Sequence, residues 1–183
     1  FYSLIGNNFH VKLNMVVMEG FNTCEIHDFI ELTRKLPVSV RFIEEMPFNG
    51  QGNSYSGIKW NADRIISHIR ERYHIRKLPD PANAIALHYK ITNFAGNIAV
   101  IPAYSRSLCG SCNRLRITAT GDLKLCLYSD AALNLRDLLR SGIGEEELVE
   151  IIQNAVLNKP IDGFEAEKQK KSSIHESMSM IGG

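Results

Sequence analysis

Three of the four cysteines in this 183-residue chain lie close together in the sequence. Cys109, Cys112 and Cys126 have the spacing Cys-x2-Cys-x13-Cys, whereas Cys24 is isolated. Thiolates are ligands of zinc and of iron-sulfur clusters, and a Cys-x2-Cys turn is a common half of such a site. The spacing therefore predicts a metal centre in this stretch.

The residues between the second and third of these cysteines predict a β-hairpin. Polar and apolar residues alternate over 114–117 and over 123–127, and the Thr-Gly-Asp sequence at 120–122 is typical of a turn. Successive strand side chains point to opposite faces, so one face of the hairpin is polar if its leucines and Ile117 face a core. That polar face would carry Arg114, Arg116, Lys124 and Cys126.

Two arginines next to a metal ligand indicate a ligand that they could bind. The guanidinium groups of Arg114 and Arg116 are planar and can form paired hydrogen bonds with phosphate or with the carbonyl edge of a purine. An anion or a nucleotide is the predicted ligand. The alternative is a solvated strand face that binds nothing.

The identity of the metal stays open at the level of spacing. Structural zinc usually has four protein ligands, but no second ligand follows Cys126 at 127–129. Three thiolates favour an iron-sulfur cluster with one iron that has no cysteine ligand. The alternatives are zinc completed by a distant His88 or His175, or reduced cysteines without metal.

The first half of the chain predicts a parallel α/β arrangement. A strand over 9–18 is followed by a helix over 24–35 and a second strand over 38–46. Such a strand-helix-strand order implies a right-handed crossover, which is the unit of a barrel or a doubly wound sheet. Ligand-binding groups in these folds gather at the carboxyl ends of the strands.

Polar residues inside the two predicted strands are further candidates for a site. Lys12 and Asn14 are two residues apart and so share a face of the first strand, and Arg41 lies in the second. Charged strand residues are costly to bury unless they face a wet cavity or a partner. The alternative for Lys12 is a salt bridge to Glu44 or Glu45.

The remaining segments follow a simple pattern. We expect a mobile loop over 49–57, a helix over 60–73, a linker near 79–81, antiparallel strands over 86–91 and 97–101, helices over 134–140 and 145–158, and a charged, flexible connection over 162–173. His88 is predicted to be an ordinary strand residue.

Composition excludes several classes of protein. The net charge of +1, with 44% hydrophobic residues, is that of an ordinary globular chain rather than a polyanion-coating one. No run of residues is long and apolar enough to predict a membrane span, and no signal-peptide pattern is present. Clustered cysteines at ligand spacing favour a reducing, cytoplasmic location over a disulfide framework.

The cysteine segment, LCGSCNRLRITATGDLKLCLYSDAALNLRDLLRSG, resembles the carboxy-terminal cluster segment of the molybdenum cofactor biosynthesis protein A family, the radical S-adenosylmethionine GTP 3′,8-cyclases. The resemblance extends through VKLNMVVMEGFN and VRFIEEMPFNG to the final Gly-Gly, so it covers nearly the whole chain. The Cys-x3-Cys-x2-Cys loop with which that family cleaves S-adenosylmethionine does not occur in these 183 residues. The chain is thus expected to be the carboxy-terminal half of a longer enzyme.

The resemblance implies a fold and a division of the chain. Residues 1–80 would be the last βα units of a partial (β/α) TIM-type barrel, and 81–160 an α+β extension that binds a cluster and GTP. Residues 161–183 would be a flexible tail ending in Gly182 and Gly183, which enter the active site in the family.

The resemblance also implies a reaction and its ligands. Cys109, Cys112 and Cys126 would bind a 4Fe-4S cluster whose open iron takes the guanine ring. Contacts to GTP would come from Lys12, Arg114, Leu115 and Arg116, and a contact to S-adenosylmethionine from Met46, with Asn14 and Arg41 in supporting roles.

The expected activity is conversion of GTP to (8S)-3′,8-cyclo-7,8-dihydroguanosine 5′-triphosphate in molybdopterin synthesis. Without the missing cluster motif, this chain should bind ligands but not turn over. The whole enzyme is expected to be a dimer and to pass its product to the next enzyme of the pathway, with no membrane or nucleic-acid partner. Two alternatives remain: a zinc-stabilised nucleic-acid-binding module and a radical enzyme that acts on peptides.

Overall fold

The computed structural model describes residues 1–48, 57–171, 177–178 and 181. They form two compact units: unit 1 comprises residues 1–46 and 57–111, and unit 2 comprises residues 47–56 and 112–183. The predicted loop over 49–57 falls outside the described residues except for Gly57, and so does the final Gly-Gly.

Unit 1 is built on a five-stranded sheet with the order β1-β2-β5-β4-β3. Its strands are β1 (Lys12–Val17), β2 (Ser39–Glu44), β3 (Ile75–Lys77), β4 (Leu87–Ile91) and β5 (Asn97–Ile101). β1, β2 and β5 are parallel to one another, whereas β4 is antiparallel to both β5 and β3. The predicted parallel crossover and the later change to antiparallel pairing are both confirmed.

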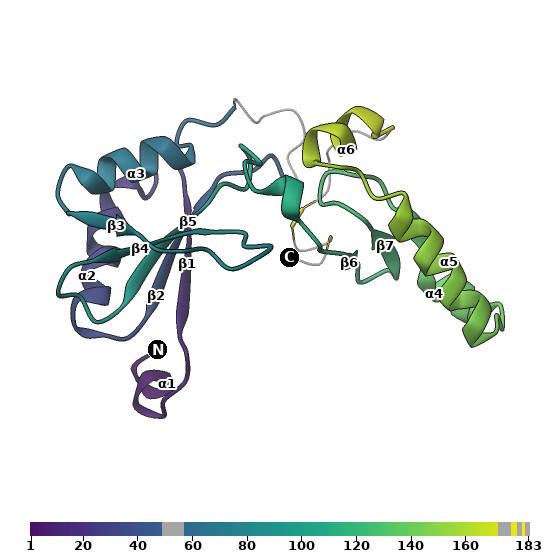
Figure 1. Cartoon of the computed structure of the whole chain (residues 1–183), viewed down its shortest axis with the longest axis horizontal. Helices are drawn as coiled ribbons and strands as arrows, with labels where there is room; N and C mark the ends of the chain where they lie inside the picture. The colour runs from purple at the N-terminus through teal and green to yellow at the C-terminus, as the bar shows by residue number, and fades with distance from the viewer. Residues whose placement is uncertain (49–56, 172–176, 179–180, 182–183) are drawn as a thin grey trace. The chain divides into compact units, whose positions relative to one another are not determined.

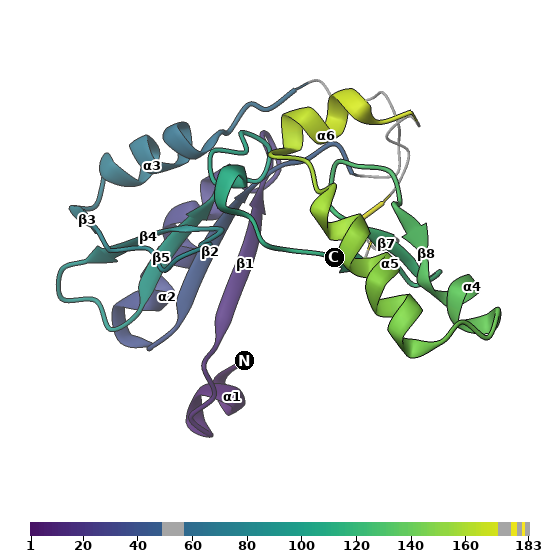
Figure 2. The same ribbon diagram turned by 45° about the vertical axis from the view of Figure 1, so that its right-hand side comes forward.

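One face of this sheet is covered by helices (Figure 1, Figure 2). The helical elements that precede β5 along the chain are α1 (Tyr2–Gly6), η1 (Thr23–Glu25), α2 (Ile26–Lys35) and α3 (Ala62–Arg70). The apolar core contains Ile30 of α2, Ile65 of α3 and alternate strand residues such as Phe42 and Ile98. Burying this apolar stripe is the main force that holds α2 and α3 on the sheet.

The other face of the sheet is polar because side chains alternate along each strand. In β1 the buried residues Met15 and Val17 alternate with the exposed Lys12 and Asn14. Asn14 is paired with Arg41 of β2, so these side chains share the face that no helix of unit 1 covers. The predicted common face of Lys12 and Asn14 is therefore confirmed.

The described part of unit 2 contains a small antiparallel sheet with the order β6-β7-β8 and the helices α4, α5 and α6 (Figure 2). These elements are β6 (Arg116–Ile117), β7 (Asp122–Lys124), β8 (Leu133–Asn134), α4 (Leu135–Arg140), α5 (Glu145–Leu157) and α6 (Gly163–Gln169). The Asn134 side chain caps α4 by accepting a hydrogen bond from the amide of Asp137.

The expectation of a flexible, charged connection over 162–173 is wrong for most of that range, because α6 forms there. The Asp162 carboxylate accepts hydrogen bonds of 2.8 Å from the amides of Phe164 and Glu165, which caps the helix. Ala166 is buried. A single cap and one small buried face are enough to order a segment whose composition alone indicates disorder.

Candidate functional site

The predicted hairpin is present in unit 2. β6 and β7 are antiparallel, and Arg116 is paired with Lys124. Gly121 has a φ of 90°, and its amide donates to the carbonyl of Thr118 at 3.0 Å. Hydrogen bonds to the Asp122 carboxylate, first from Thr120, lower the pKa of Asp122 and so stabilise this turn in its charged form.

The burial of the hairpin follows the prediction only in part: Leu123 and Leu125 are buried as predicted, but three other residues are not placed as expected. Ile117 is 59% exposed and Leu115 is also exposed, whereas Lys124 is only 1% exposed. β6 is an edge strand and β7 is the central strand of the sheet, so side chains of β7 are covered from both sides. Position in the sheet, rather than the alternation of residue types, decides which side chains are buried here.

Thiols and guanidinium groups lie close together on and beside the hairpin. Burial lowers the pKa of the half-buried Arg116, as does the neighbouring guanidinium of Arg114, whereas the thiols of Cys112 and Cys126 act in the opposite direction. Effects of this kind require the four groups to lie within a short distance of one another. The structure therefore groups four of the predicted site residues within unit 2.

Two residues that the sequence did not indicate hold the backbone around these thiols. The Ser129 hydroxyl donates to the carbonyl of Cys126 at 3.0 Å and fixes a turn there. The Lys159 ammonium donates to the carbonyl of Arg114 at 2.8 Å and to the carbonyl of Leu125. Lys159 thus links the two arms of the hairpin. It lies far along the chain from Arg114 and Leu125, so no local sequence motif indicates this role.

Cys109 belongs to unit 1, on the short helix η3 (Cys109–Ser111), and the boundary between the units follows Ser111. Its amide donates to the carbonyl of Arg106 at 3.0 Å. Within the described parts of the chain, no three His, Cys, Asp or Glu side chains are arranged to hold a metal ion. The three-thiol ligand set stays a prediction from the sequence.

The residues of unit 2 nevertheless fit a thiolate-bound group. Cys112 and Cys126 are half-buried, and the cationic side chains of Arg114 and Arg116 lie near them. Sulfur donors of this type suit iron-sulfur clusters and zinc equally well, so the donor set alone does not choose between them.

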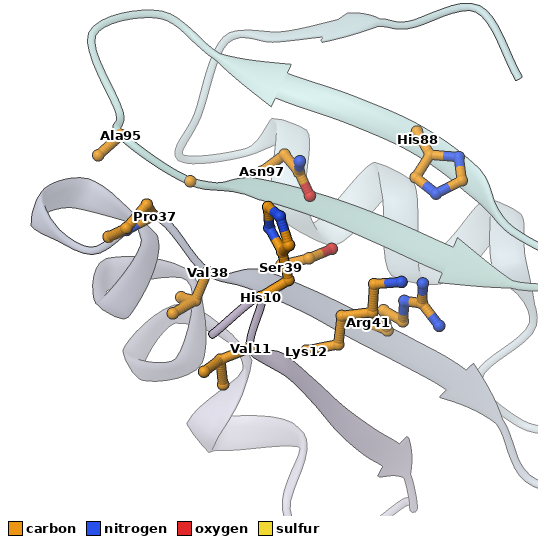
Figure 3. Close-up of a pocket in the computed structure, with 11 residues that line it drawn as sticks. His10, Val11, Lys12, Pro37, Val38, Ser39, Arg41, His88, Ala95 and Asn97 are labelled. Carbon is orange, nitrogen blue, oxygen red and sulfur yellow. The ribbon is translucent and has the colours of Figure 1, made fainter. Parts of the chain in front are cut away.

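Unit 1 has a separate cavity of about 270 Å³ on the polar face of its sheet (Figure 3). The lining includes the cationic side chains of Lys12 and Arg41, together with Ser39 and Asn97. Among the residues that the structure describes, no acidic side chain lines this cavity. Lys12, Ser39 and Asn97 begin their strands, so the cavity lies at the amino ends of β1, β2 and β5 rather than at the predicted carboxyl ends.

Two buried polar atoms in this cavity have no hydrogen-bond partner among the described residues: Nε of Arg41 and Oδ1 of Asn97. Buried polar groups in proteins are almost always paired, so a ligand or water is expected to contact them. Excess positive charge and an unused guanidinium N–H favour an anionic ligand that also carries a hydrogen-bond donor.

His88, which the sequence predicts to be an ordinary strand residue, lines the same cavity. Its Nδ1 lies 3.0 Å from Oδ1 of Asp80, which also accepts from the His88 amide at 3.0 Å. Burial acts to raise the pKa of Asp80, but hydrogen bonds from Lys77 and His88 outweigh it and the pKa is lowered. Asp80 thus fixes the orientation of the His88 ring.

Not every predicted residue joins these groups. The Glu44 carboxylate is buried and fully engaged elsewhere, which excludes the predicted alternative of a Lys12–Glu44 salt bridge. Met46 follows the carboxyl end of β2, is half-buried and does not line the cavity that contains Lys12.

Unit 1 is thus an α/β unit with a cationic cavity on one sheet face, and unit 2 carries a hairpin with cysteines and arginines on and beside it. The description "Molybdenum Cofactor Synthesis C" belongs to the family model that matches residues 38–164, and this chain is a member of that family.

Relatives from several kingdoms extend the match. The chain is 46% identical over 156 residues to "Molybdenum cofactor biosynthesis protein 1" of Mus musculus, covering 81% of this chain and 23% of that protein. It is 38% identical over 181 residues to "GTP 3',8-cyclase" of Clostridium perfringens (strain SM101 / Type A), covering 97% and 54%. It is 38% identical over 156 residues to "GTP 3',8-cyclase, mitochondrial" of Arabidopsis thaliana, covering 81% and 38%.

The chain therefore spans between about a quarter and about half of the length of these relatives. Among the helices that the structure describes, none has the length and apolar character needed to cross a membrane.

Proposed function

We propose that this chain is the part of a GTP 3′,8-cyclase that binds GTP and an iron-sulfur cluster in molybdenum cofactor biosynthesis. The observation that carries the proposal is the proximity of Cys112, Cys126 and Arg114 to Arg116 on and beside one hairpin of unit 2, within the segment that the family model matches. Two relatives with this segment are named for the same reaction.

The proposed 4Fe-4S ligands are Cys109, Cys112 and Cys126. Such a cluster, when bound by three cysteines, supplies an iron with a free coordination position that the guanine ring can occupy. The protein contributes the geometry. Lys159 and Ser129 hold the backbone on either side of the hairpin, and Arg114 and Arg116 place positive charge next to the thiolates.

The proposed GTP contacts are those that the family resemblance implies. Arg114, Leu115 and Arg116 would contact the nucleotide at the hairpin, and Lys12 would bind phosphate, supported by Arg41 and Asn14. The cavity around Lys12 supports this assignment because it contains cations, no acidic side chain and the buried Nε of Arg41. Charge-assisted hydrogen bonds of this type contribute about 1.5–3 kcal/mol each.

The remaining assignments concern the whole enzyme. Unit 1 would be the end of a partial (β/α) barrel, with Met46 contacting S-adenosylmethionine in a site that other segments complete, and with Gly182 and Gly183 reaching the active site. We further propose a dimer that hands its product to the next enzyme of the pathway, in a compartment such as the cytoplasm that keeps thiols reduced.

Anaerobic loading with iron and sulfide tests the cluster. We expect iron and sulfide in near-equal amounts and broad visible absorption in the chain, and loss of both in Cys126→Ser. Cys24→Ser is the matched control, since Cys24 is exposed and isolated. A colourless protein that retains one zinc with four ligands would contradict the cluster and favour the zinc-stabilised nucleic-acid module.

Calorimetry with GTP tests the nucleotide site in the loaded chain. Arg116→Ala and Lys12→Ala should each weaken binding roughly tenfold to a hundredfold, the loss expected for one charge-assisted hydrogen bond. Arg140→Ala is the control, because Arg140 is exposed at the end of α4. RNA affinity that falls steeply with salt, without GTP binding, would instead support the nucleic-acid module. No GTP affinity and no RNA affinity would favour a peptide-modifying enzyme.

A further inference from the structure

Glu44 occupies an unusual place at the carboxyl end of β2. It is 0% exposed, and its carboxylate accepts four hydrogen bonds. Oε1 accepts from the Ala62 amide at 2.7 Å and from the Ser105 hydroxyl at 2.8 Å, and Oε2 accepts from the amides of Tyr104 at 2.8 Å and Ser105 at 2.7 Å. All of these groups belong to unit 1.

These contacts leave Glu44 no capacity for direct chemistry. An ionised carboxylate has about four lone-pair positions, and four donors already use them. Glu44 can therefore neither ligate a metal nor accept a proton from substrate without losing contacts that hold it in place. A buried carboxylate is costly unless fully paired, so its role must lie in what the four donors fix.

These hydrogen bonds connect three parts of unit 1: Glu44 at the end of β2, the first residue of α3 and the loop after β5. That loop leads directly to the first predicted metal ligand. The Arg106 amide donates to the carbonyl of Pro102, and the Cys109 amide donates to the carbonyl of Arg106, both at 3.0 Å. Two successive backbone hydrogen bonds thus span the segment from Pro102 to Cys109.

The same loop contains an unfavourable backbone conformation. Arg106 has a φ of 57°, in the left-handed region that side chains other than glycine, asparagine and aspartate rarely adopt. Such a conformation persists only where its surroundings hold it, and it is frequent at functional sites. The Glu44 carboxylate binds the two amides that immediately precede Arg106 and is well placed to hold it.

We propose that Glu44 is a positioning residue for Cys109: through Tyr104 and Ser105 it fixes the loop that presents this thiol to the metal. The inference rests on the proposed function only in taking Cys109 as a ligand. Glu44 acts through the loop and contacts neither metal nor substrate.

Glu44→Gln tests the positioning step in the metal-free chain. The amide NH₂ that replaces one oxygen is itself a donor, so at least one backbone amide loses its acceptor whichever way the side chain turns, whereas the Ser105 hydroxyl can turn to accept from the NH₂. Cys109 should then react with iodoacetamide about tenfold faster, because loss of a buried hydrogen bond increases local opening. Cys24 and Cys126, followed by mass spectrometry in the same sample, should react at unchanged rates.

Glu31→Gln is the matched control. Glu31 also accepts side-chain hydrogen bonds within unit 1, from Arg34 at 2.5 and 2.9 Å and from the Tyr73 hydroxyl at 2.7 Å, but it does not contact the loop after β5. We expect this variant to leave the reactivity of Cys109 unchanged. Should Glu44→Gln fail to fold, as judged by Trp60 fluorescence, Ser105→Ala removes one donor alone and should raise Cys109 reactivity by a smaller factor.

Iron loading gives a second result that separates this inference from the proposed function. A folded Glu44→Gln chain should bind less iron than the unmodified chain and show an altered electron paramagnetic resonance spectrum after reduction, whereas Glu31→Gln should match the unmodified chain. An unchanged Cys109 reactivity in folded Glu44→Gln and Ser105→Ala would overturn the positioning role. Absence of iron binding in the unmodified chain, with Cys109 reactivity still raised by Glu44→Gln, would overturn the cluster and leave the positioning role standing.

Discussion

Unit 1 and unit 2 fix their functional residues by different means. In unit 1 a continuous apolar core of strands and helices supports one face of the sheet and leaves Lys12, Arg41 and Asn97 on the other. In unit 2 the sheet is short, and neither α4 nor α5 contains a buried residue. The described buried apolar residues of unit 2 are Phe48, Leu123, Leu125, Tyr128, Ala166 and Ile181.

The difference bears on how each unit is stabilised. Burial of large apolar side chains stabilises unit 1 in the absence of any ligand. Unit 2 depends more on hydrogen bonds such as those of Lys159 and Ser129. The proposed cluster would add to its stability, because metal binding can contribute directly to folding. We therefore expect unit 1 to be the more stable unit and unit 2 to gain more from cluster loading.

The largest expected effect comes from the core of unit 1. Phe42 is fully buried in the centre of β2, and Phe42→Ala should destabilise unit 1 by about 3–5 kcal/mol through lost burial and a cavity. The fluorescence of Trp60, the single tryptophan, reports unfolding of this unit. Val149→Ala is the control, because Val149 is exposed on α5, and it should change the free energy of unfolding of unit 1 by less than about 0.5 kcal/mol. Equal effects would contradict the contrast between the units.

Removal of the Lys159 ammonium should have the next largest effect and should be confined to unit 2. Lys159→Met keeps an apolar stem but loses the hydrogen bonds to the carbonyls of Arg114 and Leu125, at a cost of about 1.5–3 kcal/mol. Amide hydrogen exchange in β7 should accelerate at least tenfold, while exchange in β2 stays the same. Lys168→Met on α6 provides the control, and a similar acceleration in that variant would contradict a specific role for Lys159.

The sequence predicted unit 1 better than unit 2, and the reason is physical. Strand periodicity and helix capping are local, so β1, α2, β2 and α3 could be located from the residue pattern. The side chains of Lys159 and Glu44 act on backbone groups far along the chain, which no local spacing shows.

The candidate site was predicted in its residue types but not in its arrangement. The hairpin with Arg116 opposite Lys124 follows from alternation, whereas the burial of Lys124 and the exposure of Ile117 depend on which strand is central. The cavity with His88 arises from the pairing of β4 with β5, which brings His88 opposite Ala99.

A pair of glycines in unit 2 tests whether its turn is as tightly packed as the core of unit 1. Gly121 and Gly142 have φ values of 90° and 79°, so alanine is strained at both, by about 1 kcal/mol. At Gly121 an added Cβ would also lie 2.5 Å from Cβ of Arg136, whereas at Gly142 it would meet open space. Thermal unfolding should show Gly121→Ala as the more destabilising by about 1–2 kcal/mol. Equal midpoints would show that the hairpin turn yields easily.

The smallest expected effect is a dependence of unit 1 on pH. Hydrogen bonds from Arg34 and then Tyr73 lower the pKa of Glu31 to about 2, and burial together with the bond to Glu31 raises the pKa of Tyr73 to about 12. A lowered carboxyl pKa stabilises the folded state above the ordinary value of 4.5, and this stability is lost as the pH falls towards 2. A raised phenol pKa stabilises the folded state below 10, and this stability is lost as the pH rises towards 12.

Both pKa shifts depend on one shared hydrogen bond, so their effects do not simply add. The Glu31 side chain is 36% exposed, and solvent screening limits the acid effect to below about 1 kcal/mol. Trp60 fluorescence during denaturant unfolding should show the free energy of unfolding falling at both ends of the pH range. Tyr73→Phe should reduce the alkaline decrease, and the part that persists is assigned to Tyr89, whose pKa burial also raises. Tyr128→Phe in unit 2 should leave the alkaline decrease in place. If Tyr128→Phe removed it instead, the alkaline sensitivity would belong to unit 2, and the assignment of greater intrinsic stability to unit 1 would hold only near neutral pH.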